Sequence, residues 1–300
     1  MVKSKQICDF LNTKFYGNQS FVECYTSIDQ PKENSILFLK NKSNKNLKQL
    51  MNHDKCIIIL PKEMKGHDNF KDSWGYIFSE DPRSTFFQII NEFFMEANPL
   101  RIDSSAYISN DTEIGINTSI GKNTNIIGNC IIGDNVTIGS NVLIIGPCKI
   151  GDNTSIASGV IIGEESLSIR YENELAVQNP QLGGVIIGKN SRIGVFSTIS
   201  RGSIGDTVLG ENVFLGEYAH VGHNSYVSNN SVLTIRSSIC GSVNIMKKCW
   251  LGPHSVILNG VIVHEKIKLG INSVLQTNVK KPGTYFGNPA KLLEFMQKNV

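Results

Sequence analysis

Aliphatic residues recur at every sixth position through most of the chain. Stepping by six from Ile102 reaches Ile162 without meeting a polar residue, and the register resumes at Ile187. After a slip, it continues from Leu209 to Leu275, again with aliphatic residues alone. A period of six fits neither the 3.6-residue helix nor a long amphipathic strand. It is typical of a solenoid in which each hexad forms one short strand and one turn.

The other positions of the hexad favour the same interpretation. The residue two before the aliphatic one is often small, Gly commonly follows it, and Asn, Asp and Lys fill the turns. Three hexads would close a triangular coil, and successive coils would stack roughly 4.8 Å apart. The alternative of an ice-binding solenoid requires a flat face of regularly repeated Thr, whereas the Thr here occupy inward positions irregularly. We therefore expect a parallel β-helix filled by the aliphatic residues.

Two breaks interrupt the repeat. Residues 163–184 separate Ile162 from Ile187, and the spacing from Ile199 to Leu209 is ten rather than six. A loop as long as the first would project from the prism, where it could cover a neighbouring chain or a substrate. Regular coils serve as scaffold and irregular segments tend to hold function, so both breaks are candidate functional regions.

The N-terminal hundred residues alternate between helix and strand patterns, which indicates a small α/β domain. Asp81 and Pro82 form a helix N-cap and first position. The sequence predicts helices over 5–15, 44–52 and 81–97, and strands over 35–39, 55–61 and 74–80. The resulting domains are an N-terminal α/β domain over 1–98, a β-helix over 99–281, and a C-terminal tail with one short helix over 282–300.

Composition narrows the class of protein further. A net charge of +3 without a dense Lys/Arg cluster gives no reason to expect nucleic acid. Polar residues interrupt every apolar run near the N-terminus, and no stretch approaches the roughly 18 apolar residues of a spanning helix. The seven cysteines are odd in number and lack C-x-x-C spacing, which favours reduced thiols over disulfides. We expect a soluble, cytoplasmic protein without a membrane span.

Two histidines lie three apart in "EYAHVGHNSYV", residues 217–227. Because Val221 points inward, His220 and His223 should both lie on the outside of the prism. Gly241 comes one coil after His223, so its backbone should stack directly beside the imidazole. Glycine leaves its N–H unobstructed and permits close approach by a ligand. A base beside an exposed N–H donor is the minimum arrangement for acyl transfer, and two ordinary surface histidines are the alternative.

A zinc site is the other alternative for these histidines. Three ligands would have to converge on one point of the prism. His254 and His264 are not a whole number of coils from His223, so they should lie at other levels. We therefore predict no metal.

Three stretches, "NPQLGGVIIGKNSRIGVFSTISRGSIGDTVLG", "YAHVGHNSYV" and "CGSVNI", resemble the UDP-3-O-acylglucosamine N-acyltransferase family of lipid A biosynthesis. The order of segments in the N-terminal domain is also similar, so the likeness is expected over nearly the whole chain. The matching positions are Pro180, Gln181, Gly183, Arg201, Gly202, Asp206, Thr207, His223 and Asn224.

The resemblance implies a left-handed β-helix, a homotrimer and an N-terminal domain that binds uridine. It assigns His223 as general base and the N–H of Gly241 as oxyanion donor. Asn224, Gln181 and Arg201 occupy family positions and are expected to bind substrate, and Phe38 matches the aromatic residue that stacks on uracil. His220 is expected either to contact phosphate or sugar or to orient its neighbour.

The expected reaction is transfer of an acyl group from a thioester donor to the amino group of a nucleotide-linked amino sugar. No cofactor is expected to stay bound, because acyl carrier protein or an acyl-CoA would be a co-substrate. The ending "KPGTYFGNPAKLL" resembles acetyl-CoA-dependent hexapeptide acetyltransferases. An acetyltransferase of a UDP- or dTDP-amino sugar, for O-antigen or capsule, therefore stays open, as does a non-catalytic protein that binds a sugar nucleotide.

Overall fold

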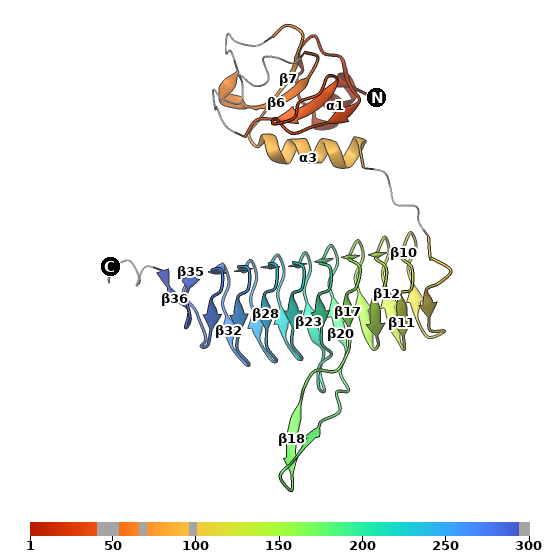
Figure 1. The fold of residues 1–300 in the computed structure, drawn as a ribbon, viewed down its shortest axis with the longest axis vertical. Helices are drawn as coiled ribbons and strands as arrows, with labels where there is room; N and C mark the ends of the chain where they lie inside the picture. Colours follow the sequence, from red (N-terminus) through yellow and green to blue (C-terminus); the bar gives the residue numbers. More distant parts are fainter. Residues whose placement is uncertain (41–53, 66–70, 96–100, 294–300) are drawn as a thin grey trace. The chain divides into compact units, whose positions relative to one another are not determined.

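The computed structural model of the chain describes residues 1–40, 54–65, 71–95 and 101–293. The chain divides into two units, Met1–Asn98 and Pro99–Val300. Each unit has hydrophobic clusters of its own, and each is described here by itself (Figure 1).

The N-terminal unit is built on a five-stranded sheet with the strand order β2-β7-β6-β5-β4. Strands β4 to β7 are parallel, and β2 runs antiparallel to β7. Residues 44–52, where the sequence predicts a further helix, lie outside the described residues. The elements of this unit are β1 (Val2–Lys3), α1 (Ser4–Leu11), β2 (Tyr16–Gly17), β3 (Phe21–Val22), β4 (Cys24–Tyr25), β5 (Ser35–Phe38), β6 (Ile57–Pro61), the 3₁₀ turn η1 (Lys62–Met64), β7 (Gly75–Ser79) and α3 (Pro82–Phe93).

The two faces of this sheet bury separate clusters, because successive side chains along a strand point to opposite faces. Ile57, Ile59 and Ile77 belong to the cluster that also holds residues of α1 and α3. Leu37 and Ile58 belong to the cluster on the other face. Helix α3 begins as the sequence predicts, since the Asp81 side chain accepts a hydrogen bond from Ser84 N and Pro82 takes the first helical position.

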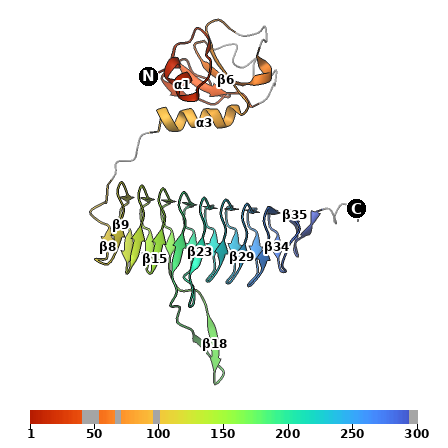
Figure 2. The same cartoon turned by 180° about the vertical axis from the view of Figure 1, so that it is seen from behind.

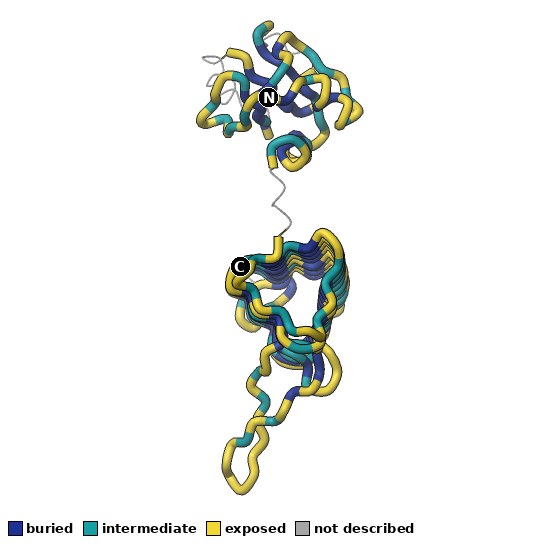
Figure 3. The backbone as a smooth tube through the Cα atoms, turned by 90° about the vertical axis from the view of Figure 1, so that its right-hand side faces the viewer, coloured by how far each residue is buried: buried dark blue, intermediate teal, exposed yellow. Residues whose placement is uncertain are grey.

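The second unit is the expected β-helix, with three parallel sheets that form the faces of a triangular prism (Figures 1 and 3). The first face consists of β10 (Ser119–Ile120), β13 (Thr137–Ile138), β16 (Ser155–Ile156), β21 (Arg192–Ile193), β24 (Phe214–Leu215), β27 (Val232–Leu233), β30 (Trp250–Leu251), β33 (Ile267–Leu269), β35 (Gly283–Phe286) and β36 (Lys291–Leu292). The second face consists of β8 (Tyr107–Ile108), β11 (Asn125–Ile127), β14 (Leu143–Ile145), β17 (Ile161–Ile162), β22 (Thr198–Ile199), β25 (His220–Val221), β28 (Ser238–Ile239), β31 (Val256–Ile257) and β34 (Val274–Leu275). The third face consists of β9 (Glu113–Ile114), β12 (Cys130–Ile132), β15 (Cys148–Ile150), β20 (Val185–Ile187), β23 (Thr207–Leu209), β26 (Tyr226–Val227), β29 (Asn244–Ile245) and β32 (Ile262–Val263).

The aliphatic residues of the repeat stack in register and form one continuous core. Ile162 pairs with Ile199 across the first break, and Ile199 pairs with Val221 across the slip, so both insertions leave the register intact. Val221 and Ile239 are fully buried. Burial of each such side chain stabilises the fold by about 1.5–3 kcal/mol, which explains why no polar residue occupies these positions.

The turn residues adopt the backbone conformation that the coil requires, and the small inward residues form hydrogen bonds with its backbone groups. Asn117 and Asn135, like many turn residues of the helix, have a positive φ of 56° and 55°, a conformation that Asn tolerates better than most residues. The buried hydroxyl of Thr118 donates to Gly133 O (2.9 Å) and accepts from Val136 N (3.1 Å). The period of six thus repeats a backbone conformation as well as a hydrophobic contact.

The first break projects from the prism as a hairpin (Figures 1 and 2). Its strands, β18 (Ile169–Glu172) and β19 (Leu175–Gln178), pair antiparallel. The expected C-terminal helix begins later than predicted, because Lys291–Leu292 forms β36 and pairs antiparallel with β35, and helical backbone starts only at Leu293. The end of the sheet offers unpaired backbone groups that such a strand can satisfy. Residues 294–300 lie outside the described residues.

Candidate functional site

His223 lies at the corner of the prism between strands β25 and β26, directly against Gly241 of the next coil. A Cβ atom built on Gly241 would lie 2.6 Å from Cε1 and 2.8 Å from Cδ2 of the imidazole, with Nε2 nearer still. Only a residue without a side chain therefore fits beneath the ring. The N–H of Ser242 donates to His223 O (2.7 Å), which ties the two coils together at this level.

Two backbone N–H groups at this corner lack an acceptor within the described chain. The N–H two residues after the aliphatic position also lacks one in some other coils, as at Lys189 and Lys247 among the described residues. In several coils it donates to a side chain of the next coil. Examples are Asp134 N to Asp152 Oδ1 (2.8 Å) and Glu211 N to Asn229 Oδ1 (3.0 Å). The equivalent N–H groups of His223 and Gly241 have no acceptor among the described residues. Since residue 241 has no side chain, nothing caps the N–H of His223, and both donors remain available to a ligand.

Asn224 holds the imidazole in place and selects its tautomer. The Asn224 side chain donates from Nδ2 to Gly205 O (3.0 Å) and accepts at Oδ1 from Ser203 N (2.9 Å). These two backbone groups fix which end of the amide is oxygen. His223 Nδ1 lies 3.1 Å from the same Oδ1, so Nδ1 must carry the hydrogen and donate it. In the neutral ring, Nε2 then has a free lone pair and can accept a proton.

The slip in the repeat supplies the groups that hold Asn224. Ser203 and Gly205 lie within the extra residues between Ile199 and Leu209, and Thr207 Oγ1 accepts from Asn224 N (2.8 Å). The sequence marks this break as a candidate region and includes Thr207 among the matching positions. It does not indicate that Ser203 and Gly205 contact the residue after the histidine.

His220 occupies β25 on the second face of the prism. Its Nδ1 lies 2.7 Å from Thr198 Oγ1, a contact that the sequence analysis missed. Burial lowers the pKa of the His220 imidazole below its ordinary value, because the charged form loses hydration. The ring is therefore neutral at pH 7, which suits hydrogen bonding to a substrate or to a neighbouring side chain.

Gln181 and Arg201 anchor the base of the projecting hairpin. The Gln181 side chain is buried and bonds Ser166 at both ends, accepting from the N–H (2.8 Å) and donating to Oγ (2.9 Å). Arg201 donates to the carbonyl oxygens of Gly163 (2.6 Å) and Gly146 (2.7 Å). The contacts of both side chains are thus internal to the chain, and their expected role in substrate binding stays a prediction.

Phe38 belongs to the N-terminal unit, at the end of β5. Its ring packs beside Phe86 of α3, with the ring centroids 5.1 Å apart. The expected stacking on uracil stays a prediction.

Over the described ranges, no three His, Cys, Asp or Glu side chains gather as a metal ion would require. Neither described helix is long and apolar enough to span a membrane.

Comparison with known proteins agrees with the repeat and the fold. The family described as bacterial transferase hexapeptide (six repeats) matches residues 111–146. UDP-3-O-acylglucosamine N-acyltransferase of Bordetella parapertussis is 28% identical over 108 residues, which is 36% of this chain and 30% of that protein. The enzyme of the same name from Herminiimonas arsenicoxydans is 27% identical over 127 residues, 42% of this chain and 36% of that protein. The chain therefore spans about a third of the length of these relatives, and the aligned part is shorter than the resemblance implies.

Solved structures resemble the β-helix over a longer stretch. UDP-N-acetylglucosamine acyltransferase from Campylobacter jejuni superposes with a TM-score of 0.58 at 26% identity, covering 67% of this chain and 78% of that one. The Francisella novicida enzyme of the same name gives 0.57 at 24% identity, covering 62% and 67%, and shows the fold alone. The resemblance stated from the sequence is confirmed as a similarity: residues 111–146 match the bacterial transferase hexapeptide repeat, and the β-helix resembles that of the Campylobacter jejuni acyltransferase.

Proposed function

We propose that the protein transfers an acyl group from a thioester to the amino group of a nucleotide-linked amino sugar. One observation carries the proposal: the His223 imidazole, held at Nδ1 by Asn224, lies against Gly241 where two backbone N–H groups have no acceptor in the described chain. A base and an oxyanion site side by side are what acyl transfer requires. The relatives' names support the choice of a UDP-linked sugar.

In the proposed mechanism, Nε2 of His223 removes a proton from the amine as its nitrogen attacks the thioester carbonyl carbon. The carbonyl oxygen becomes negative and accepts a hydrogen bond from the N–H of Gly241, an interaction worth roughly 3 kcal/mol where single donors have been removed from other enzymes. When the C–S bond breaks, His223 returns the proton to the departing sulfur. The products are an amide and a free thiol, and the base is regenerated.

Asn224 acts as a positioning residue in this scheme. Its Oδ1 accepts from Nδ1 both before and after the ring takes up a proton, so the ring need not turn during the reaction. His220 would contact the sugar or phosphate, or orient a neighbour. By resemblance, the site would lie between subunits of a homotrimer, and acyl carrier protein or coenzyme A would present the acyl group.

The test is an assay of thiol release with the full chain. Acyl carrier protein thioesters of several lengths and acetyl-CoA would each be combined with a panel of UDP- and dTDP-linked amino sugars. We expect release only with one class of amino sugar, and loss of several orders of magnitude in kcat for His223→Ala. Wild-type turnover in that variant would refute the role of His223.

A matched control separates the role of His223 from the loss of any histidine. His254 is exposed and lies at a turn with φ of 57°, so His254→Asn keeps a residue that tolerates this conformation. It should leave kcat unchanged. Nucleotide-sugar binding without thiol release from any donor would instead favour the non-catalytic protein, and release from acetyl-CoA alone would favour the acetyltransferase.

A further inference from the structure

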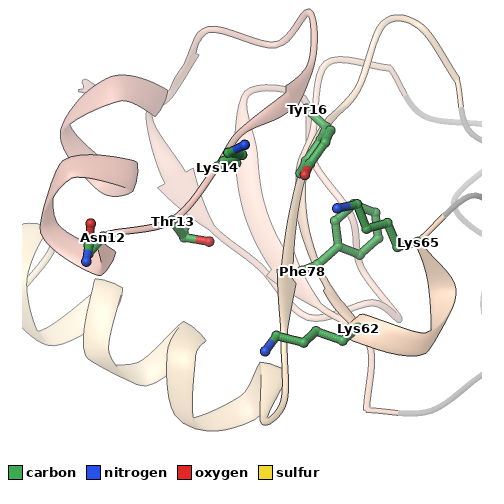
Figure 4. A pocket seen from close by; sticks show the side chains of 7 residues that line it. All are labelled: Asn12, Thr13, Lys14, Tyr16, Lys62, Lys65 and Phe78. Atoms are coloured by element: carbon green, nitrogen blue, oxygen red, sulfur yellow. The ribbon is translucent and has the colours of Figure 1, made fainter.

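A pocket of about 500 Å³ lies in the N-terminal unit beside strands β2 and β7. It is formed by the segment after α1, by β2, by the turn η1 with the residue after it, and by the end of β7 (Figure 4). The first two segments are adjacent in the sequence, whereas η1 and β7 come much later in the chain. The lining residues are Asn12, Thr13, Lys14, Tyr16, Lys62, Lys65 and Phe78.

The charged residues that line this pocket are all lysines. Lys14, Lys62 and Lys65 line it, and no carboxylate does. Lys62 pairs with Glu80 (2.8 Å), whereas Lys14 and Lys65 have no carboxylate partner within the part of the chain that the structure describes. Ammonium groups that share a concave surface repel one another, and such a surface concentrates anions. A bound anion would remove the repulsion.

Hydroxyl groups and rings complete the pocket. Thr13 contributes a hydroxyl to the lining, and Figure 4 shows the Lys65 ammonium beside the rings of Tyr16 and Phe78. Lys65 Nζ lies 5.2 Å from the centre of the Tyr16 ring, and Tyr16 packs edge-on against Phe78 at 5.3 Å. The lining therefore offers donors for oxygen atoms and an aromatic wall for a flat group.

This pocket is separate from the surface to which the family resemblance assigns uracil. Phe38 packs with the cluster that holds residues of α1 and α3, on one face of the sheet. Tyr16 and Phe78 pack with the cluster on the opposite face. Side chains on opposite faces of one sheet cannot contact the same small ligand, so a ligand here would be additional to uracil at Phe38.

We propose that the pocket binds a phosphorylated small molecule, with the lysines and hydroxyls on its phosphate oxygens and a flat group against Tyr16 and Phe78. A phosphate ester fits because it carries close to two negative charges and several acceptor oxygens on one small centre. Lysine is a common phosphate ligand that acts as a point charge. The proposal does not rest on acyl transfer and concerns a different unit of the chain.

Calorimetric titration of the full chain tests the proposal, with inorganic pyrophosphate, ADP and uridine as probes at low salt. We expect pyrophosphate and ADP to bind, with ADP the tighter of the two because its base can pack on the aromatic wall. Uridine should not bind this pocket, and the affinity of pyrophosphate should fall as salt rises.

Variants localise the binding. Lys14→Gln and Lys65→Gln should each weaken pyrophosphate binding about tenfold, since each charge-assisted contact is worth about that factor. Lys5→Gln removes the same charge from an exposed residue outside the pocket lining and should change nothing. Thermal melts should show that all variants are folded. No binding by wild type, or equal loss in the Lys5 variant, would overturn the proposal. Because acyl transfer is assayed separately, either proposal can fail alone.

Discussion

Replacing Gly241 with Ala tests the contact between the ring and the next coil. The added Cβ would lie 2.6 Å from Cε1 of His223, against an ordinary contact of 3.4 Å or more, so the ring must move by about 1 Å. Gly241 does not have a positive φ, so Ala fits the backbone and keeps its N–H. Misplacement of a catalytic group by 1 Å can cost about 100-fold in rate, equivalent to about 2.7 kcal/mol of transition-state stabilisation. We expect kcat/KM to fall by about that factor.

The assay is thiol release with the thioester and amino sugar that the panel assay selects, together with thermal melting of each variant. If the strain comes from the ring, Gly241→Ala should lower Tm in the wild-type background and have almost no effect in His223→Ala, where no ring meets the Cβ. Equal losses of Tm in both backgrounds would show that another neighbour causes the strain. A folded Gly241→Ala enzyme with wild-type turnover would refute the proposed geometry.

Substitutions at three further residues test the surroundings of the site. Asn224→Ala removes the side-chain oxygen that accepts from His223 Nδ1 and should lower kcat about 100-fold or more. Asn224→Asp should shift the acidic limb of the pH–rate profile to higher pH, because a carboxylate favours the protonated ring. An unshifted profile would contradict the contact. Arg201→Ala leaves the carbonyls of Gly163 and Gly146 without this donor and should cost roughly 2 kcal/mol in urea unfolding; a loss of activity without loss of stability would instead indicate substrate binding. His220 has a lowered pKa when folded, so acid favours the unfolded state, and stability should fall as pH drops below about 6.5. His220→Gln should flatten this pH dependence in thermal melts, and an unchanged slope would argue against a buried neutral ring.

Much of the fold could be predicted from the sequence because the β-helix repeats a local rule. Three kinds of residue recur every six positions: a buried aliphatic residue such as Val221, a small inward residue and a turn residue with positive φ. This pattern by itself predicts the coil. The same arithmetic placed Gly241 beside His223, since one coil is a fixed number of residues. The start of the C-terminal helix was predicted too early: the helical pattern could not reveal that β35 offered a sheet edge at which Lys291–Leu292 pairs.

The sequence by itself determined the coil, its register and the level at which His223 meets Gly241, because these depend on local spacing. Only the tertiary structure decided the orientation of the Asn224 amide, since Ser203 and Gly205 reach it from an irregular loop that follows no repeat. It alone brought the lysines of the N-terminal pocket together, because they come from segments with no shared pattern. Contacts between distant, non-repeating segments arise from packing, and no short stretch of sequence encodes them.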